Sequence, residues 1–192
     1  MSRRSGPFRI ITVCTGNIAR SPAAERLLRV GLGGPVVVES AGTGAVVGAP
    51  IEPAMAALLA RDGVDVENFQ ARAVTESMIR DADLVLPLTR SHRSIVVDMV
   101  PAAVRRTFTL REYAAIVRMI GPAMEMRSGA VEALTDLTMR ATLARTELSL
   151  APEDRDVPDP YGRADLDYRL AFDLIRESTA EIISLARRIA RA

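Results

Sequence analysis

The feature that most constrains the fold is a short apolar run, Phe8 to Val13, followed closely by a helical pattern from Pro22 to Val30. The first run has the character of a buried strand, and the second places Leu27 and Leu28 on one side of a helix. Strand-like and helix-like segments keep alternating along the chain. This alternation predicts right-handed crossovers and an α/β fold, with a four-stranded parallel sheet covered by helices on both faces.

The other three strands are expected at Val36 to Glu39, Ala82 to Leu86 and Arg105 to Leu110. Further helices are expected at Pro53 to Arg61, Thr75 to Arg80, Ser91 to Val100 and Asp165 to Arg191. The 192 residues suffice for one ordinary core, so we predict a single domain, 1–192, with a helical insertion at about 114–150. Met-containing helical segments in that insertion favour core packing, but we also consider a helical hairpin beside the cleft that selects substrates.

Composition excludes several classes of partner. The formal net charge is only +1, so no basic excess draws the protein to nucleic acid or to a membrane surface. No run approaches the roughly 18 apolar residues of a membrane span, and a single cysteine cannot form an internal disulfide. We therefore expect a cytoplasmic protein without membrane insertion.

The loop after the first strand is the expected site, because ligands of parallel sheets bind at the carboxyl ends of the strands. Gly16 can adopt a positive φ and Asn17 tolerates one, so successive amides can turn inward to form an anion-binding nest. Ser21 suits an N-cap and Pro22 the first helical position, which adds the dipole of the helix. The predicted phosphate-binding residues are Thr15, Gly16, Asn17, Ile18, Ala19 and Ser21.

Cys14 and Arg20 give this loop its chemistry. The guanidinium of Arg20 can hold two phosphate oxygens, and the nest, the dipole and Arg20 together would stabilise the thiolate of Cys14. A lone cysteine is more often a small buried apolar residue. The surrounding loop favours a nucleophile instead.

The motif Cys-x5-Arg-Ser-Pro, from Cys14 to Pro22, resembles that of the low-molecular-weight protein tyrosine phosphatases. A second motif, Asp159-Pro160-Tyr161, looks like the general-acid loop of that family. Ser40 to Thr43 and the pair Ala71-Arg72 also match it.

The resemblance implies a mechanism without metal or cofactor. Cys14 would form a phosphocysteine, Arg20 would bind the phosphate, and Asp159 would act first as acid and then as base. Ser40, with Asn17 and Ser21, would support the loop by hydrogen bonds. Tyr161 would form one wall of the cleft.

Some positions depart from the family pattern. Ala19 replaces a protective second cysteine, and Phe69 replaces a histidine that supports the loop. The stretch Gly44 to Gly48 is similar to that of bacterial exopolysaccharide-associated members, whose partners are autophosphorylating bacterial tyrosine kinases. A phosphotyrosine protein is thus the expected partner, and a bacterial tyrosine kinase of this kind is one candidate.

Two other functions stay open at this point. One is an arsenate reductase that uses an external thiol, and the other is a non-catalytic phosphotyrosine-binding module. The sequence leaves the oligomeric state open. We expect His92, the single histidine, to be solvated or to cap a helix.

Overall fold

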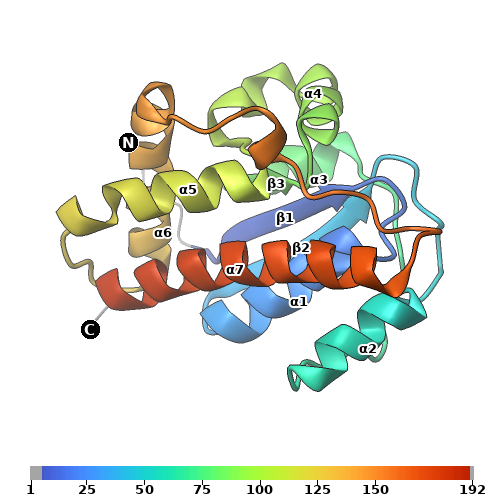
Figure 1. Cartoon of the computed structure of the whole chain (residues 1–192). Coiled ribbons are helices and arrows are strands. Elements are labelled where there is room, and N and C mark those ends of the chain that lie inside the picture. The colour runs from blue at the N-terminus through green and yellow to red at the C-terminus, as the bar shows by residue number, and fades with distance from the viewer. Residues whose placement is uncertain (1–5, 191–192) are drawn as a thin grey trace.

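The computed structural model describes residues 6–190 and has a parallel sheet at its centre. The sheet contains three strands in the order β2-β1-β3, where β1 is Phe8–Cys14, β2 is Val36–Gly42 and β3 is Leu84–Pro87. Figure 1 shows β1 between its two neighbours, with its Cys14 end at the side where α7 begins. Since the chain leaves β1 for one neighbour and later returns to the other, the carboxyl end of β1 lies at a topological switch point.

The predicted fourth strand, Arg105 to Leu110, is wrong. Pro101–Arg106 forms a short 3-10 helix, η1, and a capping box between Thr109 and Glu112 already begins the next α-helix. Only two residues remain for extended backbone between these elements. They make one isolated parallel bridge, Val85 with Thr107, and the amide of Phe108 donates to the carbonyl of Val85.

Seven α-helices are described between residues 6 and 190. They are α1 (Arg20–Leu32), α2 (Pro53–Arg61), α3 (Glu76–Asp81), α4 (Arg90–Met99), α5 (Leu110–Ile120), α6 (Ala130–Ala144) and α7 (Asp165–Ile189). The short 3-10 helices after η1 are η2 (Gly121–Ala123), η3 (Arg145–Glu147) and η4 (Glu153–Arg155). The predicted end of the last helix, Arg191, lies outside the described residues.

Helices cover both faces of the sheet, as predicted. Alternate residues of β1 point to opposite sides. Ile10 and Cys14 belong to the larger apolar cluster, with side chains of α1, α2, α5, α6 and α7, whereas Ile11 and Val13 join α3, α4 and η1. Figure 1 shows the sheet between these two layers.

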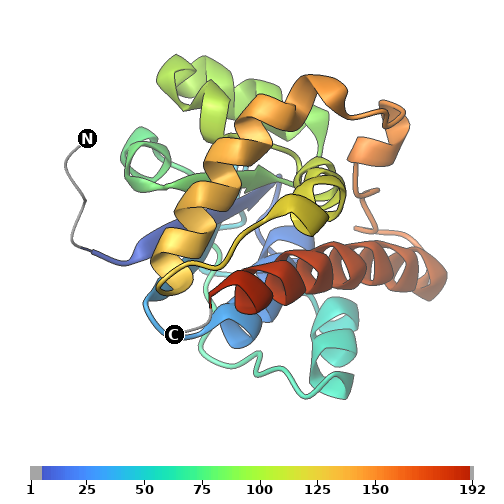
Figure 2. The same cartoon turned by 90° about the vertical axis from the view of Figure 1, so that its left-hand side faces the viewer.

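Residues 114–150 form part of the larger layer. Ala133, Leu134 and Leu137 of α6 are fully buried in the main core. The amide of Arg127 donates to the carbonyl of Ile189, so the connection between α5 and α6 lies at the C-terminal end of α7. Figure 2 shows α6 at this same end of the molecule. The hypothesis of a hairpin beside the cleft is therefore wrong for residues 121–144, because α7 extends about 37 Å from that end to Asp165.

Within the described part of the chain, no helix has the length and apolar character needed to cross a membrane.

Core packing of α6 can be tested with a matched pair of substitutions. Leu137 is fully buried, whereas 57% of Met139, two residues along the same helix, is exposed. Leu137→Ala should lower the free energy of unfolding by about 2–5 kcal/mol through the cavity it leaves. Met139→Ala should change it by less than about 0.5 kcal/mol. Urea denaturation measures both, and equal effects would contradict the core assignment of α6.

Candidate active site

The candidate site is built on the loop from Cys14 to Ser21, called here the cysteine loop. Asn17 adopts a positive φ of 55°, as expected, but Gly16 does not. Helix α1 begins at Arg20 with Ala19 as its N-cap, so the prediction of a Ser21 N-cap and a Pro22 start is wrong. Ser21 does not cap the helix because its hydroxyl points to Cys14 and Asn17 instead. Pro22 still lies in the first turn, where no amide hydrogen is required.

Backbone hydrogen bonds hold the cysteine loop open. The amides of Thr43, Gly44 and Val46 donate to the carbonyls of residues 14, 15 and 16 at 2.9–3.0 Å. The amide of Glu52 donates to the carbonyl of Ile18 at 2.7 Å. With these carbonyls bonded to the loop after β2, we expect the amides of the cysteine loop to face its interior, where an anion could bind. Gly42 permits this close approach, since a Cβ atom there would overlap the carbonyl oxygen of Thr15.

A chain of buried hydrogen bonds runs from Glu25 to the sulfur of Cys14. Ser40 donates to the carboxylate of Glu25 at 2.5 Å and accepts from Nδ2 of Asn17 at 2.9 Å. The same Nδ2 donates to the hydroxyl of Ser21 at 2.9 Å, and this hydroxyl lies 3.0 Å from Sγ of Cys14. Because Ser21 accepts from Asn17, its own hydroxyl hydrogen can be donated either to the carbonyl of Ala41, at 3.4 Å, or to a thiolate of Cys14.

Glu25 and Arg72 are supports that the sequence reasoning missed. The backbone amide of Arg72 donates to Oδ1 of Asn17, which fixes the orientation of that side-chain amide, and its Nε donates to the carbonyl of Ser40. Phe69, in the position of the family histidine, instead lies beneath the guanidinium of Arg26. The apolar and polar periodicity of α1 gives no signal for Glu25, because its carboxylate is bonded to Ser40 of β2, which is 15 positions away in the sequence.

Arg20 joins the cysteine loop to a distant segment, the aspartate loop, defined as residues 156–162. Its Nη2 lies 2.6 Å from Oδ2 of Asp159, and its Nη1 donates to the carbonyl of Val157 at 3.2 Å. Arg20 is almost fully buried, while 48% of the Asp159 side chain is exposed. The two predicted charged site residues are therefore brought together across 139 positions of sequence.

Tyr161 lies beside Asp159, as the motif requires. Its amide donates to Oδ1 of Asp159 at 3.3 Å, and its side chain is 64% exposed. A role for that ring as a cleft wall stays a prediction.

The expectation that His92 is solvated is wrong. Its imidazole is buried, and it bonds Oγ1 of Thr15 through Nε2 at 2.9 Å and Oγ1 of Thr89 through Nδ1 at 2.8 Å. The residue that caps the helix is Thr89, which accepts from the amide of His92. Burial and, after it, the charge of Arg20 lower the pKa of His92 from 6.5 to about 4.

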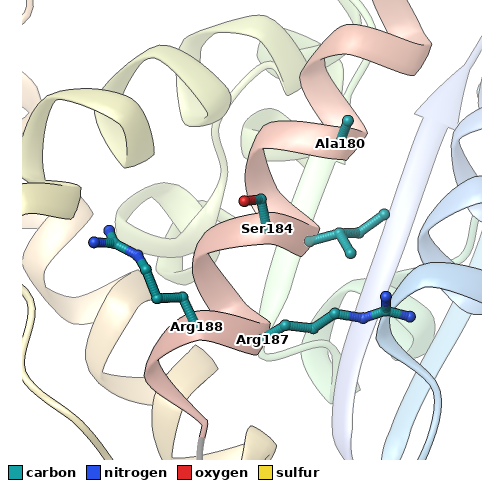
Figure 3. A pocket seen from close by; sticks show the side chains of 5 residues that line it. Ala180, Ser184, Arg187 and Arg188 are labelled. Atoms are coloured by element: carbon teal, nitrogen blue, oxygen red, sulfur yellow. The ribbon is translucent and has the colours of Figure 1, made fainter.

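A hollow along the C-terminal half of α7 offers no such chemistry. Figure 3 shows its lining, which comes from that one helix: Ala180, Ile183, Ser184, Arg187 and Arg188. It contains no carboxylate, histidine or cysteine. Among the described residues, no group of three or more His, Cys, Asp or Glu side chains is arranged to hold a metal ion.

A parallel α/β sheet with a cysteine–arginine loop after its first strand, and an aspartate paired to that arginine, is the arrangement of a cysteine-dependent phosphatase. Residues 9–120 match the family described as low molecular weight phosphotyrosine protein phosphatase. The chain belongs to this family, which confirms the resemblance seen in the sequence. The match does not include the aspartate loop.

Two proteins of similar sequence agree with this assignment to the family. The chain is 39% identical over 103 residues to the probable low molecular weight protein-tyrosine-phosphatase EpsP of Ralstonia nicotianae, covering 54% of this chain and 70% of EpsP. It is 38% identical over 104 residues to the low molecular weight protein-tyrosine-phosphatase Etp of Escherichia coli, covering 54% and 70%.

Solved structures share the fold. Wzb of Vibrio vulnificus in complex with benzylphosphonate superposes with a TM-score of 0.68 at 23% identity, covering 93% of this chain and 99% of that one. The YwlE arginine phosphatase of Geobacillus stearothermophilus gives a TM-score of 0.70 at 24% identity, covering 95% and 94%.

The chain of hydrogen bonds predicts a catalytic effect of Glu25, which forms no part of the cysteine loop. Glu25→Ala removes the acceptor of Ser40, so Asn17 and Ser21 lose their fixed orientation, and kcat on an aryl phosphate should fall about 10-fold. Glu25→Gln keeps an acceptor for Ser40, so its kcat should fall less. Glu76→Ala, which breaks an exposed ion pair with Arg80 on α3, is the control and should keep the wild-type kcat. An unchanged kcat in Glu25→Ala would show that the chain serves stability alone.

The lowered pKa of His92 predicts a pH-dependent stability. Between pH 6.5 and about 4 the unfolded chain binds a proton at this imidazole that the folded protein does not, so stability falls as the pH decreases through this range. Above pH 6.5 this contribution is constant. His92→Gln lacks it, and the carboxylates common to both proteins cancel in the comparison. Urea denaturation at several pH values should show the wild type losing stability relative to the variant only below pH 6.5; parallel profiles would rule this out.

Proposed function

We propose that this chain hydrolyses phosphotyrosine in proteins through a phosphocysteine intermediate on Cys14. The observation that carries the proposal is the hydrogen-bond chain that ends on Sγ of Cys14. This cysteine lies in a loop whose carbonyls accept hydrogen bonds from the segment after β2. Such a loop can hold a phosphate dianion by its inward amides, by the N-terminus of α1 and by Arg20. The loop residues involved are Thr15, Gly16, Asn17, Ile18, Ala19 and Ser21.

The first chemical step forms a bond between Sγ and phosphorus while the bond from phosphorus to the tyrosine oxygen breaks. Asp159, protonated, donates its proton to that oxygen, so the phenol leaves neutral. The loop amides and Arg20 carry the charge of the three equatorial phosphoryl oxygens.

The second step hydrolyses the phosphocysteine. Asp159, now ionised, takes a proton from water, whose oxygen bonds to phosphorus as the bond to sulfur breaks. The thiolate then leaves, and the hydroxyl of Ser21 stabilises it by the contact already described.

The pairing of Arg20 with Asp159 has a consequence for substrate binding. The guanidinium that should bind phosphate is bonded on one side to a carboxylate, at 2.6 Å, and on the other to the carbonyl of Val157. A phosphate dianion competes with the carboxylate for the same charge. Binding of substrate therefore favours release of Asp159 from Arg20 towards the leaving oxygen.

The relatives and the Gly44 to Gly48 stretch favour a phosphotyrosine protein as substrate. We propose a bacterial tyrosine kinase as one such protein. We also propose that the reaction takes place in the cytoplasm. We also propose that residues 1–192 form one phosphatase domain to which 114–150 add a helical segment, because α5 and α6 share the core of the sheet.

A panel of substrates tests the function. Purified protein should release phosphate from a phosphotyrosine peptide, with little release from a phosphoarginine peptide and no arsenate-dependent consumption of thiol. Cys14→Ser should abolish turnover while still binding phosphate, because the nest remains and the thiolate does not. Turnover by Cys14→Ser within tenfold of wild type would refute the nucleophile, and phosphate binding without any wild-type turnover would favour a binding module.

The acid is tested by the quality of the leaving group. Asp159→Asn should slow turnover of phosphotyrosine by roughly 10²- to 10⁴-fold, since the phenol needs a proton to depart. An activated aryl ester such as 4-nitrophenyl phosphate should lose much less, because its phenolate departs unaided. Steady-state kcat on both substrates gives the comparison. Equal losses would make Asp159 a structural residue.

A further inference from the structure

The segment Leu88 to His92, called here the junction segment, follows β3, includes the first residues of α4 and contacts both loops of the site. None of its residues belongs to either loop. Leu88 is fully buried, His92 is nearly so, and the side chain of Arg90 is about half exposed. Each of these residues bonds a different neighbour.

On one side the junction segment holds the cysteine loop. The amide of Leu88 donates to the carbonyl of Val13, the residue before the nucleophile, at 2.8 Å. The imidazole of His92 bonds the hydroxyl of Thr15, the residue after it, at 2.9 Å. Cys14 thus lies between two residues that are both bonded to the same five-residue segment.

On the other side the junction segment holds the aspartate loop. The carbonyl of Leu88 accepts from the amide of Val157 at 2.8 Å. Arg90 makes four hydrogen bonds to Asp156: its amide and its Nε donate to Oδ1 at 2.7 and 3.4 Å, and its Nε and Nη2 donate to Oδ2 at 3.2 and 3.1 Å. These residues come directly before Asp159 in the chain.

We propose that the junction segment sets the position of the two loops relative to each other, with His92 as a positioning residue for the cysteine loop and Arg90 for the aspartate loop. This inference rests on the proposed function for its kinetic consequences. The two residues should then affect different steps. His92 acts on the phosphate-binding amides, whereas Arg90 acts on delivery of the proton to the leaving group.

The side-chain chemistry of His92 supplies a matched pair of variants. A neutral imidazole must donate from one nitrogen and accept at the other to satisfy Thr15 and Thr89 together. A glutamine side chain reaches about as far as Nε2, and so can keep the bond to Thr15. An asparagine side chain reaches only as far as Nδ1, and can keep only the bond to Thr89.

For His92, the measurement is alkylation of Cys14 by iodoacetate and its protection by inorganic phosphate, alongside KM. His92→Asn should weaken phosphate protection about 3- to 10-fold and raise KM for phosphotyrosine and 4-nitrophenyl phosphate by the same factor. His92→Gln should recover most of this loss. Thr15→Val removes the same bond from the exposed side and should reproduce His92→Asn, which keeps the test available should that variant not fold. Equal behaviour of the Asn and Gln variants, or wild-type protection in Thr15→Val, would overturn this half of the proposal.

For Arg90, the measurement is the dependence of kcat on the leaving group. Arg90→Lys keeps a charge but cannot make the two-pronged contact with Asp156. It should lower kcat for phosphotyrosine about 3- to 10-fold more than kcat for 4-nitrophenyl phosphate, with phosphate protection unchanged. Arg80→Gln, which breaks the exposed pair with Glu76, is the control and should match wild type. An equal loss on both substrates, or no loss, would overturn the assignment of Arg90.

The wild-type rates separate this proposal from the function on which it rests. A wild-type protein that hydrolyses neither ester refutes the proposed function and, with it, the assignment of Arg90. Phosphate protection of Cys14 needs no turnover, and therefore still decides the assignment of His92.

Discussion

The site depends on one buried carboxylate, that of Glu25. A carboxylate with so little access to water needs compensating partners: Ser40 donates a hydrogen bond to it, and Arg29 forms an ion pair with it at 3.6 Å. Once Ser40 donates to Glu25, it can only accept from Asn17, and Asn17 in turn can only donate to Ser21. Each donor direction in the chain therefore follows from the charge at its far end. The hydroxyl of Ser21 lies 3.0 Å from the sulfur of Cys14 and can donate to a thiolate there, so a residue on the buried side of α1 acts on the nucleophile through this chain.

The site also depends on contacts between two loops that lie far apart in the sequence. The cysteine loop follows β1, while the aspartate loop comes more than 130 residues later, and only side chains and single backbone bonds hold them together. Arg20 provides a charged contact, whereas the junction segment provides neutral backbone bonds and the Arg90–Asp156 pair. Bound substrate can compete for the charged contact but not for the neutral ones. A bound phosphate competes for Arg20 but not for Leu88 or His92, so Asp159 can change partners while Val157 and Thr15 keep theirs.

Local patterns in the sequence were enough to predict the layers, most helices and the Cys14–Arg20 loop, whereas Asp159 was named through the family resemblance and its ion pair with Arg20 is seen only in the structure. Helix α2 has the predicted bounds, because Pro53 and Asp62 limit it locally. The prediction of a fourth strand failed because only Thr107 and Phe108 are extended, between the 3-10 helix η1 and the capped start of α5. Glu25, Arg72 and His92 were missed for a different reason: each acts through partners at least 15 residues away in sequence, and a single polar residue on a helix is normally solvated.

The position of Asp159 finally depends on packing far from it. The aspartate loop ends where α7 begins, and α7 is held along its buried side by α1 and α5, with Ile175 and Ile182 fully buried. Residues 110–144 cover the part of this helix farthest from the site, where Arg188 donates to the carbonyl of Gly121. A shift of the helix along its axis would move its first turn, and Asp159 with it, relative to Arg20. Protein interiors are too closely packed to allow such a shift without opening cavities. We therefore expect the helical segment between the sheet and the aspartate loop to affect the active site through the core, by limiting movement of α7 along its axis.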